Sequence, residues 1–260
     1  MCLLLVAHDC CPGYRLVVAA NRDEFHDRPT APAAAWDDHP HIVGGRDLEA
    51  GGSWLALDHR GRFATITNVR SGLPAPGARS RGLIVNDFLD GGNTAAAYAA
   101  ALADDAEAYA GFNVLLHDGR ELCWYSNQSG HGPRSLARGI YTLSNALLDT
   151  AWPKSERLRA GFGEIVDAAD REHMVAQLLT LLRDEQRPPD GALPDTGIGH
   201  AMERVLSTIF IAGSGYGTRC STVILIDEQD QLTFHERRYD AHARISGETR
   251  LAFELHAAPA

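Results

Sequence analysis

The sequence predicts an α+β fold with antiparallel sheets, and three observations support this prediction. Segments typical of strands lie near both ends of the 260-residue chain, and segments typical of helices lie in its middle. Neighbouring strand segments are joined by short turns, of which Asp118-Gly119 is the strongest hairpin signal. Strands and helices do not alternate regularly, as they would in a parallel sheet. No segment has the composition of a linker, so we expect residues 1–260 to form a single domain.

The first half of the chain is dominated by pairs of strands. The first pair flanks a turn at Pro12-Gly13, and the last pair flanks Asp118-Gly119. The segment between the second and third pairs contains two helical patterns, the second of which is rich in alanine. The predicted strands comprise residues 2–8, 14–20, 53–57, 62–68, 112–117 and 121–126, and the predicted helices comprise residues 83–89 and 94–109.

The second half of the chain places two helices between strands. A short strand over residues 141–145 precedes predicted helices over residues 154–169 and 171–185, and Asp170 is placed to cap the second helix. Residues 187–199 are rich in proline and glycine and are predicted to form a loop. The closing strands are predicted over residues 221–226, 231–237 and 250–255.

The composition narrows the class of protein. Hydrophobic residues make up 45% of the chain and charged residues 22%, which is typical of globular rather than disordered proteins. The formal charge of −10 argues against nucleic-acid binding, which requires a basic face. The five cysteines form no Cys-x-x-Cys pair, so we expect neither a disulfide framework nor a metal site. No apolar stretch reaches membrane-spanning length, so the chain is expected to be cytoplasmic and without stable membrane insertion. No cofactor is expected.

Cys2 is the first candidate catalytic residue. If Met1 is removed, as is normal before a small second residue, Cys2 carries both a thiol and a free α-amine. An α-amine, with its ordinary pKa of ~7.7–8.0, is well matched to general-base catalysis at neutral pH. Cys2 would then supply the nucleophile and the base together. Taken alone, Cys2 is better explained as a small apolar residue at the start of a strand, so the interpretation depends on its neighbours.

Four consecutive polar residues, Asn21-Arg22-Asp23-Glu24, follow the second strand. If His8 lies opposite Tyr14, the hairpin register places Cys2 opposite Ala20, one residue before this polar run. The run is therefore expected near the start of the chain.

This proximity suggests roles for the polar run. Asp23 or Glu24 is expected to accept a hydrogen bond from the α-ammonium group of Cys2, and Arg22 is expected to stabilise its thiolate. A solvated turn is the alternative interpretation of four polar residues at a strand end.

Two asparagines and one arginine stand at other strand ends. Asn68 and Asn145 are suitable oxyanion donors, although turn residues that bond their own backbone are an equally good interpretation.

The glycine-rich residues 213–219 lack the helix that a dinucleotide fingerprint requires. We interpret them as a turn that presents Arg219.

The order of these motifs resembles the NRDE family, whose eukaryotic members are called transport-and-Golgi-organisation proteins. Met1-Cys2, a hairpin and Asn-Arg-Asp-Glu carry the resemblance at the start of the chain. It continues through residues 51–55, 61–63, 67–70, 143–154 and 216–219. The single lysine, Lys154, belongs to one of these blocks and is expected to be structural.

The resemblance implies an N-terminal-nucleophile hydrolase with a four-layer αββα sandwich. The related penicillin V acylases and bile salt hydrolases open with Met-Cys, carry Arg-x-x-Asp on the second strand and use downstream asparagines as oxyanion donors. Asn68 and Asn145 occupy similar contexts. The second strand departs from this pattern, because Arg22 and Asp23 are adjacent. Matching Glu24 to the aspartate would place Asn21 at the arginine position.

Two functions are therefore expected as alternatives. The first is a cysteine amidohydrolase or acyltransferase that acts on a small-molecule acyl or amide substrate through an acyl-enzyme on Cys2. In this interpretation Arg22 or Arg219 stabilises the thiolate or binds an anionic substrate, and Trp54 and Arg70 bind substrate. The second is a non-catalytic protein that binds or traffics lipid, haem or another acyl ligand on the same fold.

Overall fold

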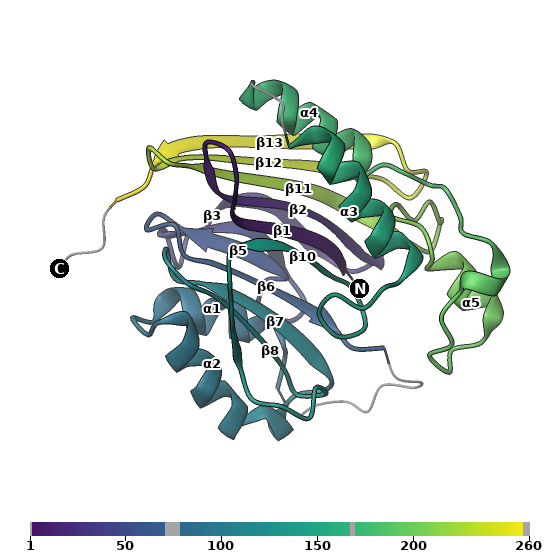
Figure 1. Ribbon diagram of the computed structural model, residues 1–260, viewed down its shortest axis with the longest axis horizontal. Helices are drawn as coiled ribbons and strands as arrows, with labels where there is room; N and C mark the ends of the chain where they lie inside the picture. Colours follow the sequence, from purple (N-terminus) through teal and green to yellow (C-terminus); the bar gives the residue numbers. More distant parts are fainter. Residues whose placement is uncertain (1, 71–78, 167–169, 257–260) are drawn as a thin grey trace.

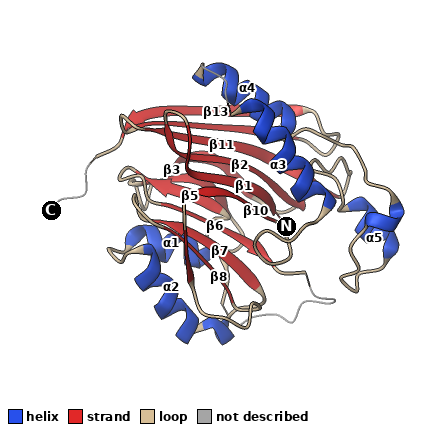
Figure 2. Ribbon diagram, in the orientation of Figure 1, coloured by secondary structure: helices blue, strands red, loops and turns tan. Residues whose placement is uncertain are grey.

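The computed structural model describes residues 2–70, 79–166 and 170–256, and it contains two antiparallel sheets packed face to face. Helices cover the outer face of each sheet, so the layers follow the order helix, sheet, sheet, helix (Figures 1 and 2). The predicted α+β class and four-layer αββα sandwich are confirmed.

The six-stranded sheet contains both ends of the described chain. Its spatial order is β10 (Gly139–Leu143), β1 (Cys2–Cys11), β2 (Tyr14–Phe25), β11 (Tyr216–Asp227), β12 (Gln231–Tyr239) and β13 (Ile245–Glu254). The first two strands of the chain therefore lie in the interior of this sheet, between strands that follow more than a hundred residues later (Figure 1).

The seven-stranded sheet follows the order of the sequence. It consists of β3 (Thr30–Ala35), β4 (Ile42–Asp47), β5 (Leu55–Asp58), β6 (Phe63–Asn68), β7 (Phe112–His117), β8 (Leu122–Ser126) and β9 (Arg134–Leu136). Helices α1 (Gly82–Asp90) and α2 (Ala95–Asp104) cover its outer face (Figure 2).

Helices α3 (Pro153–Ile165) and α4 (Arg171–Leu181) cover the outer face of the six-stranded sheet. Because side chains alternate along a strand, β1 sends Leu3 and Leu5 towards these helices and Leu4 and Val6 towards the facing sheet. Both faces are buried along Cys2–Ala7, which explains why this part of the strand is an uninterrupted apolar run. None of the helices in the described ranges combines the length and apolar character needed to cross a bilayer.

The predicted register of the first hairpin is wrong by two residues. Strand β1 continues past His8 to Cys11, with an irregularity between them where Asp9 has a positive φ of 49°. Cys11 therefore pairs with Tyr14, and Cys2 pairs with Arg22 instead of Ala20. The cause is that pairing continues to Cys11, so that the turn contains only two residues; the irregularity between His8 and Cys11 offsets one residue of the resulting shift. With the observed register, Cys2 lies opposite Arg22, which is a member of the polar run.

Strands β3 and β4 and the short helix α5 (His200–Val205) are not predicted by the sequence. β3 is an edge strand with the sequence TAPAAA, and β4 contains Gly44 and Gly45, so neither has strong strand propensity. Tertiary packing explains the glycines. A Cβ atom on Gly45 would lie 2.2 Å from the indole of Trp54, and one on Gly44 would lie 2.7 Å from Cβ of Ala56.

Several predicted boundaries also change. The alanine-rich helix ends at Asp104 and is followed by a 3-10 turn over Ala106–Ala108. Helix α4 ends at Leu181, four residues before its predicted end, and Asp170 caps its start by accepting from the His173 amide at 3.0 Å. The predicted end of the preceding helix, residues 167–169, lies outside the described residues.

Candidate active site around Cys2

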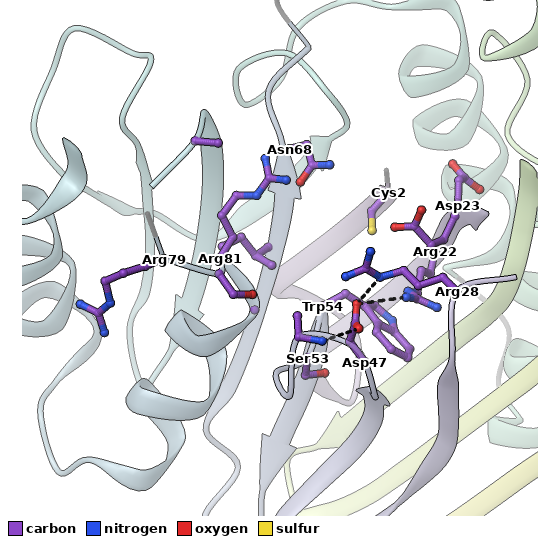
Figure 3. A pocket seen from close by; sticks show the side chains of 16 residues that line it. Cys2, Arg22, Asp23, Arg28, Asp47, Ser53, Trp54, Asn68, Arg79 and Arg81 are labelled. Carbon is purple, nitrogen blue, oxygen red and sulfur yellow. Dashed lines mark hydrogen bonds and ion pairs between the residues drawn. The ribbon is translucent and has the colours of Figure 1, made fainter. Parts of the chain in front are cut away.

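A pocket of about 410 Å³ opens at the end of the sandwich where Cys2 begins β1 (Figure 3). Its wall combines the ends of β2, β4 and β6 with the residues that precede α1. Six of the predicted site residues line it, namely Cys2, Arg22, Asp23, Glu24, Trp54 and Asn68. A second cavity of about 520 Å³ lies between α4 and strands β12 and β13 and contains none of the predicted site residues.

The thiol of Cys2 is buried, with 7% of the residue exposed. Burial raises the pKa of the Cys2 thiol because it disfavours the thiolate, while the nearby charge of Arg22 acts in the opposite direction. The resting sulfur is therefore a neutral thiol at pH 7, and a base is needed before it can act as a nucleophile.

Arg22 lies directly across the hairpin from Cys2. Its guanidinium stacks over Trp54 at 4.1 Å, donates to the Thr30 hydroxyl at 2.8 Å and lies 3.6 Å from a carboxylate oxygen of Asp47. These contacts hold the charge in place beside the thiol, as Figure 3 shows.

Of the two candidate carboxylates, Asp23 is held more firmly. Only 1% of Asp23 is exposed, its Oδ1 accepts from the Thr218 hydroxyl at 2.7 Å, and its backbone carbonyl accepts from the Tyr216 hydroxyl at 3.0 Å. Burial raises the pKa of Asp23, whereas the charge of Lys154 and the Thr218 hydrogen bond lower it. Glu24 also lines the pocket, but one of its oxygens accepts from the amide of Phe25 at 2.9 Å. Asp23 is therefore the more buried and more firmly held of the two candidate carboxylates.

Asn21 lies outside the pocket. Its Nδ2 donates to the carbonyls of Leu182 and Ile209, both at 2.8 Å, and its Oδ1 accepts from the Ser221 hydroxyl at 2.6 Å. These bonds tie β2 to β11 and to the segment after α4. The sequence predicts Asn21 among the catalytic residues, whereas the structure places its side chain away from the pocket lining, in contact with these backbone and hydroxyl groups.

Asn145 lies behind the pocket wall rather than on it. It is fully buried, and its Nδ2 donates to the backbone carbonyl of Asn68 at 3.0 Å. The neighbouring Ser144 hydroxyl donates to the carbonyl of Cys2 at 3.3 Å, which places Asn145 beside the start of β1. An amide nitrogen carries two hydrogens, and among the described residues we find an acceptor for one of them.

Arg70 and Arg219 also lie off this wall. Arg70 forms an ion pair with Glu203 at 2.7 Å, and its guanidinium lies over Trp152 at 5.0 Å. Arg219 donates to the backbone carbonyls of Phe25 and Arg28, at 2.6 and 3.1 Å, and so braces the turn after β2. Both arginines are therefore engaged in structural contacts.

Sequence reasoning missed several residues of this site. Arg28, Arg79, Arg81 and Asp47 line the pocket, yet nothing distinguishes them in the sequence from the other arginines and acids. Their roles follow from the placement of β4 and the start of α1. Among the described residues, no group of three or more His, Cys, Asp or Glu side chains is arranged to hold a metal ion.

Lys154 is buried near the site, with 4% of the residue exposed. Its Nζ donates to the carbonyl of Leu206 at 3.0 Å. Burial lowers its pKa to about 8, although the charge of Asp23 opposes this shift. The unfolded chain therefore binds more protons than the folded chain between pH 8 and the ordinary lysine pKa of 10.5.

The pH dependence of stability should reveal this buried lysine. Relative to a Lys154→Met variant, the wild-type free energy of unfolding is expected to rise by up to about 3 kcal/mol as the pH increases from 8 towards 10.5. The difference between the two proteins is needed because buried cysteines with raised pKa values act in the opposite direction in both. Denaturant titrations across this range provide the measurement, and a difference that is independent of pH would contradict the assignment.

Comparison with known proteins places this chain in a family. Residues 1–241 match the family model described as Transport and Golgi organisation 2. The human Transport and Golgi organization protein 2 homolog is 36% identical over 256 residues, which cover 91% of this chain and 92% of the human protein. The Drosophila melanogaster Transport and Golgi organization protein 2 is 31% identical over 262 residues, covering 91% of each chain.

The fold has a solved counterpart. The structure of a Caenorhabditis elegans N-acylethanolamine-hydrolyzing acid amidase ortholog is similar, with a TM-score of 0.51 at 10% sequence identity, over 86% of this chain and 92% of that chain. This likeness concerns the fold alone. With most of its length matched by the family model and by animal relatives, the chain belongs to the Transport and Golgi organisation 2 family.

Proposed function

We propose that this chain is a cysteine amidohydrolase that forms an acyl-enzyme on Cys2. The observation that carries the proposal is the position of the buried Cys2 thiol on the wall of a polar pocket, beside Asp23 and Arg22. The likeness of the fold to that of an acid amidase supports an amide as the bond that is cleaved.

The proposed reaction begins once removal of Met1 has freed the α-amine of Cys2. This amine takes the thiol proton, and Sγ attacks the carbonyl carbon, so that a C–S bond forms and the carbonyl electrons move to oxygen. Collapse of this intermediate restores the carbonyl and breaks the C–N bond, while the ammonium returns the proton to the departing amine. Water then attacks the thioester while the same amine takes a proton from it, so that a C–O bond forms. The C–S bond breaks, the acid is released, and the ammonium returns the proton to the Cys2 thiolate.

The surrounding residues would stabilise the charges that develop during the reaction. Asp23 would orient the α-ammonium group, and Arg22 would stabilise the thiolate as it forms. The second amide hydrogen of Asn145, together with the side chain of Asn68, would donate to the oxyanion. If a nucleophile other than water attacked the Cys2 thioester, the acyl group would be transferred to it and the reaction would be that of an acyltransferase.

A non-catalytic carrier of lipid, haem or another acyl ligand is the alternative, and it needs no free α-amine. The polar lining of the pocket, which includes four arginines and three carboxylates, fits a small polar substrate better than a purely apolar chain.

Intact mass and covalent labelling separate these functions. We expect the purified protein to lack Met1 and to be acylated by an electrophilic acyl probe at Cys2, as located by peptide mass spectrometry. A Cys2→Ala variant should lose this label, whereas a Cys10→Ala variant, which removes a half-buried thiol at the other end of β1, should keep it. Retention of Met1, or equal labelling of the Cys2→Ala variant, would overturn the proposal in favour of the carrier.

A further inference from the structure

The pocket has a positive lining in an acidic chain. Four arginines line it, Arg22, Arg28, Arg79 and Arg81, against three carboxylates, although the formal charge of the whole chain is −10.

Three of these arginines are already paired with carboxylates. Arg28 donates to Asp47 at 2.7 Å, and Arg22 lies 3.6 Å from the same carboxylate. Arg79 lies 2.9 Å from Asp105, away from the pocket interior. Their charges are largely compensated within the protein, so they are poor candidates for binding an anionic ligand.

Arg81 differs from the other three. Its Nη1 donates to the carbonyl of Gly111 at 3.0 Å, which is a neutral acceptor, and within the described ranges it has no carboxylate within ion-pair distance. Burial lowers the pKa of Arg81, whereas the nearby charges of Glu24 and Cys2 raise it. A partly buried cation without an adjacent counter-ion is costly, and an anionic ligand would offset that cost.

The backbone around Arg81 is also suited to an anion. Arg81 is the N-cap residue of α1, no side chain caps this helix end, and the first turn contains no acidic residue. Ser80, Arg81 and Gly82 all line the pocket, so the positive end of the helix faces the same space as the guanidinium. Figure 3 shows Arg81 beside Asn68, on the opposite side of Cys2 from Asp23.

We propose that Arg81 binds a carboxylate or phosphate group of the substrate, so that acidic amides are the preferred substrate class. This proposal rests on the proposed function in one respect, namely that the bound anion is part of a substrate. Binding of the anion next to Cys2 does not require turnover.

Two alkylating reagents that differ only in charge test the proposal. Iodoacetate carries a carboxylate and iodoacetamide is neutral, and both form the same thioether bond with loss of iodide from the reagent. We expect an Arg81→Gln variant to lower the ratio of the iodoacetate rate to the iodoacetamide rate at Cys2 by about tenfold, with a smaller loss in Arg81→Lys. The matched control is Arg79→Gln, which removes an arginine of the same pocket and should leave the ratio within twofold. Peptide mass spectrometry of Cys2 provides the rates.

Competition by small anions supplies a second measurement on the unmodified chain. Millimolar inorganic phosphate or acetate should slow iodoacetamide at Cys2 in the wild type, and the more effective anion identifies the group that the substrate carries. An unchanged rate ratio in Arg81→Gln, an equal fall in Arg79→Gln, or no protection by either anion would each overturn the assignment. Because none of these readouts depends on hydrolysis, they remain interpretable if the proposed enzymatic activity fails.

Discussion

Replacing Cys2 with alanine is expected to reduce kcat for amide hydrolysis by at least about 10⁴-fold, because the variant keeps the α-amine but loses the nucleophile. The loss should appear in kcat rather than in substrate binding, since the pocket walls contributed by Arg22, Asp23 and Trp54 remain. Single-turnover and steady-state assays of an acidic amide would measure it.

The control for this prediction is Cys220→Ala. Cys220 is a buried thiol that pairs with Arg22 from the other side of β2, so its removal perturbs the same strands without touching the nucleophile. We expect its kcat to stay within about twofold of the wild type. Full activity in Cys2→Ala, or an equal loss in Cys220→Ala, would contradict the proposed role of Cys2.

Replacing Asn145 with alanine is expected to lower kcat by about 10²–10³-fold with little change in KM, which is the usual result of removing one oxyanion donor. The same change leaves the backbone carbonyl of Asn68 without its partner, at a cost of about 1–3 kcal/mol in stability. An Asn145→Asp variant preserves the volume but removes both N–H donors, so it should show the same loss of kcat.

Asn127→Ala provides the matched control for Asn145. Asn127 is also an asparagine whose Nδ2 donates to backbone carbonyls, but its closest acceptors, Ala106 and Tyr109, do not line the pocket, whereas Asn145 donates to the pocket-lining Asn68. It should lose stability without a selective loss of kcat. If Asn145→Ala affects KM alone, or affects stability alone, the oxyanion role is wrong.

The sequence predicts the layers and the local elements of this fold well because they depend on short-range patterns. Apolar runs and turn residues predict β7 and β8 to within one residue and the starts of β1 and β2, although these two strands continue three and five residues past their predicted ends. The register of the first hairpin is wrong because the apolar pattern ends at His8, whereas the strand continues through the irregularity at Asp9 to Cys11.

The candidate site is predictable only in part, for a related reason. Cys2, Arg22 and Asp23 are close in space because one hairpin brings them together. Arg81 and Asp47 join them through packing between elements that are distant in sequence, and no local pattern carries that information. Conversely, the sequence suggests catalytic or substrate-binding roles for Asn21, Arg70 and Arg219 because they are polar. In the structure, Asn21 and Arg219 donate hydrogen bonds to backbone carbonyls, and Arg70 forms an ion pair with the buried Glu203.

The interior position of the first hairpin has a consequence for biosynthesis. Strand β2 hydrogen-bonds to β11, and the Thr218 hydroxyl that binds Asp23 lies 195 residues further along the chain. During translation, the hairpin therefore emerges long before the strands that flank it, and long-range pairing of this kind is intrinsically slow. Until β11 arrives, one edge of the hairpin is open and Asp23 lacks its hydroxyl donor. A ribosome-bound chain that stops before residue 216 would accordingly present an incomplete site and an exposed strand edge suited to capture by a chaperone.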